Sequence, residues 1–207
     1  MSGWGCDEHP FQNIRSDDYD VLMCYDYRDL DNASALFEKI EAYQECHLMA
    51  WSLGVFVSSL LFKDRTNLFT SSLAINGSLS PIDAEQGIPP AIFQGTIDGL
   101  NEKGRDKFFM RMCGGRTGYA AFAENQPQRL LADQKEELIC LQNMILKQGI
   151  TWDIFDKVLI SSRDMIFPYK NLEKAWENKG DKLIIDLPHF CFGNWTRWDE
   201  IVEVERS

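Results

Sequence analysis

Residues 47–57 constrain the fold of this chain more than any other segment. They begin as a short apolar run, pass through Ser52 and continue with a helix-like pattern. A strand that turns sharply into a helix at a serine is a nucleophile elbow, which lifts the hydroxyl out of the end of a sheet. The turn is crowded, so it needs small residues two positions before and after the serine. These residues are Ala50 and Gly54, although small-x-Ser-x-Gly is weak evidence by itself.

Apolar runs alternate with helical patterns on both sides of this segment. Strands are predicted at residues 20–25, 46–51, 67–76, 157–162 and 182–187. Helices are predicted at residues 33–43, 53–62, 168–178 and 195–204, the first of them capped by Asp31 or Asn32. Such alternation predicts an α/β protein with a mostly parallel sheet and helices on both faces. Functional groups then gather at the carboxyl ends of the strands.

The pattern changes between residues 81 and 149, where no convincing strand occurs. Helical stretches cover residues 91–100, 103–113, 119–125 and 133–147, and glycines and Pro127 interrupt them. We interpret this region as a helical cap inserted in the sheet domain. Residues 1–80 and 150–207 then form the core, and residues 81–149 form the cap.

The order of residues along the chain limits which histidine and which acid could act with Ser52. A serine hydroxyl needs a base within hydrogen-bond reach and a third group that orients the base. In α/β-hydrolases these follow in the order serine, acid, histidine. His9 and His47 precede Ser52, so only His189 fits, and Asp164 lies between them at a predicted strand end. Each residue also has a simpler interpretation, as a helix-start serine, a turn aspartate and a loop histidine, but together they favour a catalytic triad.

An oxyanion hole requires two backbone N–H donors. The residue after the nucleophile, Leu53, supplies one of them, and a loop after an early strand supplies the other. Trp4 fits the second role because Gly3 and Gly5 flank it and let the backbone turn. The alternative is that residues 1–5 form a disordered segment.

The predicted cap has an unusual charge. Residues 101–120 carry five basic and two acidic side chains, although the whole chain has a net charge of −11. The basic residues Lys103, Arg105, Lys107 and Arg111 form either a solvated helix face or a docking patch for an acidic partner, and such attraction mainly raises the encounter rate. The neighbouring Phe108 and Phe109, with Met112, form either cap core or the wall of an acyl pocket.

Composition limits the other functions. The 207 residues suit one domain with a sizeable core. The negative charge argues against general nucleic-acid binding, and no apolar run is long enough to span a bilayer. The N-terminal residues lack a secretory signal, and six scattered cysteines favour reduced thiols in a cytoplasmic protein. The three histidines have no zinc-like spacing. We therefore expect no metal, no cofactor and neither a nucleic-acid nor a membrane partner.

Several motifs together resemble the BioG family. The most specific are Cys-Tyr-Asp-Tyr-Arg-Asp-Leu at 24–30 and Ser-Ser-Arg-Asp at 161–164. The resemblance covers nearly the whole chain in matching order. It also rests on Gly-Trp-Gly at 3–5, Met-Ala-Trp-Ser-Leu-Gly-Val at 49–55, Asn-Gly at 76–77, Gly-Ile-Pro at 87–89, Phe-Gln-Gly-Thr at 93–96, Met-Ile-Phe at 165–167, His-Phe-Cys-Phe at 189–192 and Thr-Arg-Trp at 196–198. The alanine of the elbow also occurs in that family.

The resemblance implies an α/β-hydrolase that cleaves the methyl ester of pimeloyl-acyl carrier protein in biotin synthesis. It implies the same triad that chain order selected, with Ser52 as nucleophile, Asp164 as acid and His189 as base. Similarity to BioH-type esterases further assigns substrate contacts to Trp4, Leu53 and residues 108–112. The partner would be an acyl carrier protein that carries the pimeloyl methyl ester.

One departure concerns the N-terminal loop. Members of the family usually have a strand before Gly-Trp-Gly, so we expect a first strand to be missing here and the loop of Trp4 to lack its anchor. Two other functions stay open at this point. One is a general short-acyl esterase or thioesterase, and the other is a non-catalytic binding protein on a hydrolase scaffold.

Overall fold

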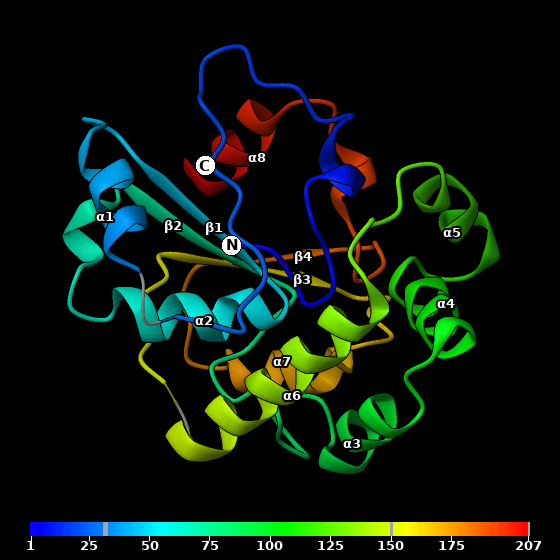
Figure 1. Ribbon diagram of the computed structural model, residues 1–207. Helices are drawn as coiled ribbons and strands as arrows, with labels where there is room; N and C mark the ends of the chain where they lie inside the picture. Colours follow the sequence, from blue (N-terminus) through cyan, green and yellow to red (C-terminus); the bar gives the residue numbers. More distant parts are fainter. Residues whose placement is uncertain (31–32, 150, 207) are drawn as a thin grey trace.

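Four parallel strands form the centre of the protein (Figure 1). A computed structural model describes residues 1–30, 33–149 and 151–206. In this part of the chain, the strands form one sheet in the order β1-β2-β3-β4, and every neighbouring pair is parallel. Their bounds are β1 (His47–Trp51), β2 (Ser71–Ile75), β3 (Lys157–Ser161) and β4 (Lys182–Ile185). Their carboxyl ends therefore lie along one edge of the sheet.

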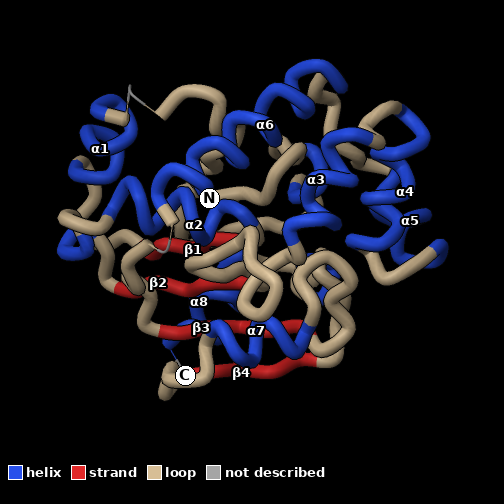
Figure 2. Tube along the Cα trace, turned by 90° about the horizontal axis from the view of Figure 1, so that it is seen from below, coloured by secondary structure: helices blue, strands red, loops and turns tan. Residues whose placement is uncertain are grey.

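Helices cover both faces of the sheet. Figure 1 shows α8 (Trp198–Arg206) above the strands, with α2 (Leu53–Phe62) and α7 (Tyr169–Ala175) below them. Figure 2, seen from below, agrees, because α2 and α7 lie in front of the strands and α8 behind. Every residue of β3 is buried, as expected for an inner strand of a parallel sheet that is covered on both sides. Helix α1 (Ser34–Glu41) precedes β1 in the chain.

Four successive helices connect β2 to β3. They are α3 (Pro90–Asp98), α4 (Glu102–Met112), α5 (Arg116–Ala123) and α6 (Leu131–Gln148). Each begins and ends within a few residues of its predicted bounds, because apolar residues at helical spacing mark them in the sequence. The division into a core and a cap stays a prediction. Helix α6 buries one face, formed by Gln134, Glu137, Leu138, Leu141 and Ile145.

Some predicted elements differ from the structure. The strand predicted at residues 20–25 is wrong, because this segment has no regular secondary structure and lies outside the sheet. It is held at one end by the bond from the Ser2 N–H to the Cys24 carbonyl (2.9 Å), and Val21 and Leu22 are half exposed. A strand needs a partner along its length, which an apolar run does not provide. The predicted cap residues 31 and 32 lie outside the described residues.

The remaining differences concern element ends. Residues 66–68 form a 3-10 helix (Thr66–Leu68), so β2 begins at Ser71. Helix α7 ends at Ala175 and α8 begins at Trp198, shorter than predicted at those ends. Further 3-10 helices cover His9–Phe11 and Phe192–Asn194. Among the described helices, none is both long and apolar enough to cross a membrane.

Candidate active site

Ser52 occupies a strained turn between β1 and α2. Its backbone has φ 59° and ψ −128°, a conformation that is rare for residues other than glycine. The surroundings are crowded, because a Cβ at Gly54 would lie 2.5 Å from the Ser2 carbonyl oxygen. At Gly77, on the neighbouring strand end, a Cβ would lie 2.2 Å from the carbonyl oxygen of Ser52. The sharp turn predicted from the sequence is therefore present, and close backbone packing holds it.

Three polar side chains from three strand ends form one hydrogen-bonded chain. The Oγ of Ser52, after β1, lies 3.0 Å from Nε2 of His189. The Nδ1 of His189, after β4, lies 2.6 Å from Oδ2 of Asp164, which follows β3. An ionised carboxylate only accepts hydrogen bonds, so Nδ1 carries the proton and Nε2 presents its lone pair to the hydroxyl. The structure thus brings together the three residues that chain order selected, in a geometry suited to nucleophilic chemistry.

The Asp164 carboxylate is fixed by backbone donors. Its Oδ1 accepts the N–H groups of Ile166 at 2.7 Å and Phe167 at 2.9 Å, which leaves Oδ2 for the histidine. The Phe167 ring also stacks on the His189 imidazole, with centroids 5.9 Å apart and an angle of 11°. Asp164 and His189 are 7% and 1% exposed, so bulk water does not compete for these bonds.

Two further residues hold the histidine, and the sequence reasoning missed both. The indole N–H of Trp51 donates to the His189 carbonyl at 3.0 Å, and Nδ2 of Asn76 donates to the same oxygen at 2.9 Å. Asn76 also accepts the Ser161 N–H at 2.7 Å, so it ties the ends of β2 and β3 to the histidine loop. A signal was present, because Asn76 is a polar residue at a strand end, directly before Gly77.

The two residues with N–H groups suited to an oxyanion, Trp4 and Leu53, line the same cavity as Ser52. Leu53 is the first residue of α2, so its N–H has no partner within the helix. The Trp4 N–H donates to no protein acceptor within the described part of the chain. The loop of residues 3–5 packs against the elbow, since a Cβ at Gly3 would lie 3.0 Å from Cβ of Ser52. The expectation that this loop lacks an anchor is wrong, because polar contacts tie it to α6.

A cavity of about 250 Å³ opens beside Ser52 and His189. Its wall is mainly apolar and includes the predicted contact residues Trp4, Leu53 and Phe108. Arg111 also lines it, as the one permanently charged side chain among the described lining residues. A larger cavity of about 940 Å³ lies between β1 and residues 16–24, and its described lining contains no member of the hydrogen-bonded triplet.

Phe109 differs from its neighbours in the predicted contact set. It is 1% exposed and packs against Phe108 and Phe122, with ring centroids 6.1 Å and 5.2 Å apart. Phe109 is absent from the described residues that line the cavity, so we assign it to the packing between α4 and α5.

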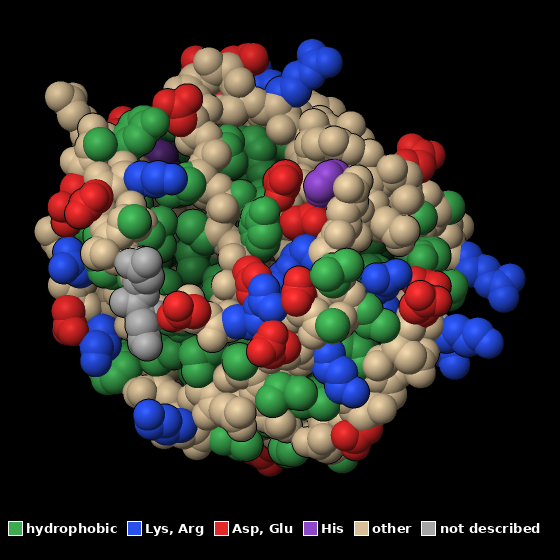
Figure 3. All heavy atoms as spheres, in the orientation of Figure 1, with side chains coloured by type: hydrophobic (Ala, Val, Ile, Leu, Met, Phe, Trp, Pro, Cys, Tyr) green, Lys and Arg blue, Asp and Glu red, His purple; other side chains and the backbone are tan. Residues whose placement is uncertain are grey.

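The basic side chains of α4 are mostly exposed. Lys103, Lys107 and Arg111 are exposed, whereas Arg105 is half-buried, with Nε 4.0 Å from Oδ1 of Asp106. Figure 3 shows Lys and Arg side chains projecting from the edge of the molecule where α4 and α5 lie. Arg111 belongs both to this face and to the cavity wall, so the basic face reaches the entrance of the cavity.

Two of the buried cysteines and a cluster near the N-terminus lie outside the hydrogen-bonded triplet. Burial raises the pKa of Cys113 and of Cys191 to about 12, which keeps both thiols protonated at neutral pH. Within the described residues, Asp7, Glu8 and His9 place potential ligand atoms within 4.8 Å of one another. Asp7 already accepts the His9 N–H at 3.1 Å and the Gln128 N–H at 2.7 Å, which accounts for this arrangement.

Comparison with known proteins identifies the family. The family model described as "Pimeloyl-ACP methyl esterase BioG" matches residues 1–201. The chain belongs to the BioG family. A crystal structure of BioG from Haemophilus influenzae is 31% identical, with a TM-score of 0.87 over 96% of this chain and 90% of that one. The resemblance seen in the sequence is confirmed, and the description of the family names an esterase that acts on a pimeloyl-ACP methyl ester.

Other relatives extend the comparison. A malonyl-[acyl-carrier protein] O-methyltransferase from Bacteroides fragilis is 41% identical over 177 residues, which cover 86% of this chain. The match spans only 36% of that protein, so this chain corresponds to about a third of it. An esterase from Exiguobacterium antarcticum is 14% identical with a TM-score of 0.65, over 100% of this chain and 90% of that one. That likeness shows the fold alone, and the predicted α/β-hydrolase fold is confirmed.

Proposed function

We propose that this BioG-family chain is a serine carboxylesterase that hydrolyses the methyl ester of pimeloyl-acyl carrier protein in biotin synthesis. One observation carries the proposal. The hydroxyl of Ser52, on a strained elbow, lies 3.0 Å from His189 Nε2, and His189 Nδ1 lies 2.6 Å from Asp164 Oδ2, beside a mainly apolar cavity. This supplies a nucleophile, a base and an orienting carboxylate in the relation that acyl transfer requires.

In the acylation step, Ser52 Oγ attacks the carbonyl carbon of the methyl ester and His189 Nε2 takes the hydroxyl proton. The negative charge of the tetrahedral intermediate lies on the former carbonyl oxygen, where the N–H groups of Trp4 and Leu53 donate to it. His189 then gives its proton to the departing methoxide, the C–O bond breaks and methanol leaves. Asp164 keeps the imidazole in the tautomer that can accept the first proton.

In the deacylation step, a water molecule replaces methanol. His189 takes a proton from the water, and the resulting hydroxide attacks the Ser52 ester. The same two N–H groups stabilise the second intermediate. His189 returns the proton to Ser52 Oγ as the bond between Oγ and the acyl carbon breaks. The pimeloyl acid, still joined to its carrier, leaves and gives its proton to water. No cofactor or metal takes part in these steps.

The surroundings suit a carrier-bound acyl chain. The apolar wall that includes Leu53 and Phe108 fits methylene groups, because such pockets bind mainly through buried apolar surface. Lys103, Arg105, Lys107 and Arg111 are the proposed contacts for acidic residues of the carrier protein. The Bacteroides fragilis relative supports this substrate class, since its name describes methyl transfer to a malonyl group on an acyl carrier protein.

The first test replaces the nucleophile. Ser52→Ala removes the attacking oxygen, and we expect release of methanol from pimeloyl-carrier methyl ester to fall by about 10⁴-fold or more. Ser59→Ala is the matched control, because Ser59 is also buried on α2 but donates to the Val55 carbonyl at 3.1 Å, away from the cavity. Unchanged hydrolysis by Ser52→Ala would disprove the assignment.

A second comparison separates the alternative functions. We expect kcat/KM to be higher for the carrier-bound ester than for free methyl pimelate, because the α4 face adds contacts to the carrier. Equal values would favour a general short-acyl esterase, and release of the carrier with a free thiol would indicate a thioesterase. A fluorophosphonate probe that fails to label Ser52 would favour a non-catalytic binding protein.

A further inference from the structure

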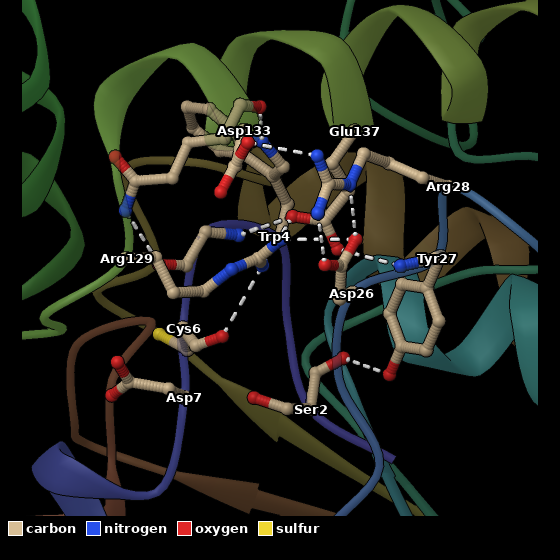
Figure 4. Close-up of polar contacts among 12 residues, drawn as sticks. Ser2, Trp4, Cys6, Asp7, Asp26, Tyr27, Arg28, Arg129, Asp133 and Glu137 are labelled. Carbon is tan, nitrogen blue, oxygen red and sulfur yellow. Dashed lines mark hydrogen bonds and ion pairs between the residues drawn. The ribbon is translucent and has the colours of Figure 1, made fainter.

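The loop that carries Trp4 is held by α6. The Trp4 indole N–H donates to the Gln134 carbonyl at 2.6 Å, and Nε2 of Gln134 donates to the Gly5 carbonyl at 2.7 Å. The Gly5 N–H donates to Oε2 of Glu137 at 3.2 Å. Figure 4 shows Trp4 next to the helix that carries Asp133 and Glu137. Three bonds thus join a short N-terminal loop to residues about 130 positions away in the chain.

Glu137 lies at the centre of this arrangement. Its side chain is 0% exposed, and its carboxylate also accepts the Tyr27 N–H at 3.0 Å and Nη1 of Arg129 at 2.6 Å. Burial raises the pKa of Glu137, and the adjacent Arg129 opposes that shift. All its partners are donors, which is the set that an ionised carboxylate satisfies.

A buried ion pair needs a reason beyond stability. Replacing such a pair with apolar side chains of similar volume is often neutral or stabilising, since both charges lose their hydration. The pair does fix the orientation of the groups that bond to it, because charge-assisted hydrogen bonds are short and have defined geometry. The bonds to Glu137 fix the orientation of the Gly5 and Tyr27 N–H groups. Arg129 also donates to the Cys6 carbonyl at 3.4 Å and so fixes that group as well.

The bond between Gly5 and Glu137 also affects the Trp4 N–H, which is the proposed donor to the oxyanion. The Gly5 N–H lies in the peptide plane that follows Trp4, so the bond to Glu137 sets that plane. The bond from the indole N–H to the Gln134 carbonyl sets the Trp4 side chain. With both groups fixed around the Trp4 Cα, the position of the Trp4 nitrogen is set. The close packing of Gly3, where an added Cβ would lie 2.9 Å from the Trp51 ring and 3.0 Å from Cβ of Ser52, then limits rotation of the preceding peptide plane, which carries the Trp4 N–H. Gly5 has φ +76°, which a residue with a side chain rarely adopts, so the loop has few alternative shapes.

We propose that Glu137 is a positioning residue for the reaction, which aims the Trp4 N–H at the oxyanion through Gly5 and relies on Arg129 for its own orientation. The inference rests on the proposed esterase function. In this proposal α6 supports the oxyanion hole from behind the Trp4 loop, and no atom of Glu137 touches the substrate. Gln134 acts on the same loop from its other side.

The test variant is Glu137→Gln, which keeps an acceptor but removes the charge. We expect kcat to fall by about 10- to 100-fold with KM unchanged, because the oxyanion forms only in the transition state. The affinity for an alkyl boronic acid, which places a tetrahedral oxygen near Trp4, falls with kcat. Glu136→Gln is the matched control, since Glu136 is the adjacent residue, is 64% exposed and pairs with Arg28 instead.

A double replacement separates positioning from folding. Glu137→Met with Arg129→Met removes both buried charges, so folding does not leave one of them unpaired. This variant leaves the N–H groups of Gly5 and Tyr27 without their acceptor, so we expect it to melt below the parent temperature but to stay folded at the assay temperature. We also expect kcat and boronic acid binding to fall by more than its folded fraction explains. Gln134→Met removes the donor to the Gly5 carbonyl, and we expect it also to lower kcat and weaken boronic acid binding.

Two results would overturn the inference. One is full kcat in Glu137→Gln and in the double variant, and the other is a loss of kcat that tracks only the folded fraction. The rate of Ser52 labelling by a fluorophosphonate, which also forms an oxyanion, is measured alongside. If the parent labels rapidly but leaves the carrier-bound methyl ester intact, the proposed substrate fails, while the labelling rates of the variants still decide the role of Glu137.

Discussion

The two sides of the candidate site are built differently. On the nucleophile side, Ser52, Asp164 and His189 stand at the ends of parallel strands, and backbone packing at Gly54 and Gly77 holds the elbow. The proposed oxyanion side is a short loop held by the side chains of Gln134 and Glu137 and by the main-chain carbonyl of Gln134. These residues of α6 lie about 130 positions away in the chain. One side is positioned by the sheet, and the other by a helix of the predicted cap.

Because of this difference, substitutions on the two sides should affect the reaction in different ways. A substitution on the nucleophile side acts through the turn in which it lies. On the oxyanion side, a substitution in α6 acts on chemistry that it does not touch, through a network of side chains. The structure therefore predicts that the two sides respond differently to mutation, and the following changes test this, from the largest expected effect to the smallest.

The largest effect is expected for Asp164→Asn on the nucleophile side. The amide cannot stabilise the imidazolium and favours the wrong tautomer of His189, so we expect kcat to fall by about 10⁴-fold while the protein stays folded. Steady-state hydrolysis of a carrier-bound or p-nitrophenyl ester measures this. Asp186→Asn is the control, because Asp186 follows β4 but is 81% exposed. A loss of less than tenfold at Asp164 would remove this residue from the proposed triad.

Gly54→Ala tests the packing between the two sides. The added Cβ would lie 2.5 Å from the Ser2 carbonyl oxygen and 2.7 Å from that of Met1, which are backbone atoms of the segment leading to Trp4. We expect the free energy of unfolding to fall by about 1–3 kcal/mol and kcat to fall as well, because the loop is pushed from the elbow. Gly180→Ala is the control, since nothing lies within 4 Å of its added Cβ. Equal denaturation midpoints for both variants would contradict the crowding.

The contrast also explains what could be predicted from the sequence. The elbow and the hydrogen-bonded arrangement of Ser52, His189 and Asp164 were predictable because a strained turn restricts residues near Ser52, and because only His189 follows it among the histidines. The parallel direction of the strands followed from the alternation of apolar runs and helical patterns. The false strand at residues 20–25 shows the limit of that method, since an apolar run does not reveal whether a neighbour pairs with it.

The anchoring of the oxyanion loop could not be predicted in the same way. Its contacts join Gly5 to Glu137 and Trp4 to Gln134, and no short motif connects residues so far apart. One signal was present in α6, where Gln134 and Glu137 share a helix face with Leu138 and Leu141. Polar residues at core positions of an amphipathic helix indicate a buried polar network, and this observation could have located it.

A smaller effect is expected for reversal of charge on α4. Lys103→Glu with Lys107→Glu should lower kcat/KM for the carrier-bound ester by about tenfold at low salt and leave free methyl pimelate unaffected. Added salt should lower the parent rate on the carrier substrate and reduce the difference between parent and variant. Lys39→Glu with Lys147→Glu, on α1 and α6, gives the same change in net charge as a control. A flat salt dependence would disprove docking at this face.

The smallest effect concerns the exposed rim of the oxyanion-side network. Two hydrogen bonds from Arg28, at 2.8 Å and 2.7 Å, lower the pKa of Asp26 from its ordinary 3.8, with Arg129 also contributing. A lowered pKa in the folded state adds stability above pH 3.8 that is lost as the pH falls through the folded value. Asp26→Asn should therefore lower the free energy of unfolding by about 0.5–1 kcal/mol at neutral pH and by less in acid. Urea titrations at both pH values measure this, and a cost that grows in acid would contradict it.

The central claim is that Ser52 attacks the methyl ester at the far end of the carrier-bound chain. Rapid acid quenching followed by intact-protein mass spectrometry tests this claim directly. If methanol is the leaving group, the trapped acyl-enzyme retains the entire pimeloyl-carrier protein on Ser52 and has lost only the mass of methanol. An adduct that carries methyl pimelate without the carrier, or one at a residue other than Ser52, would contradict the account.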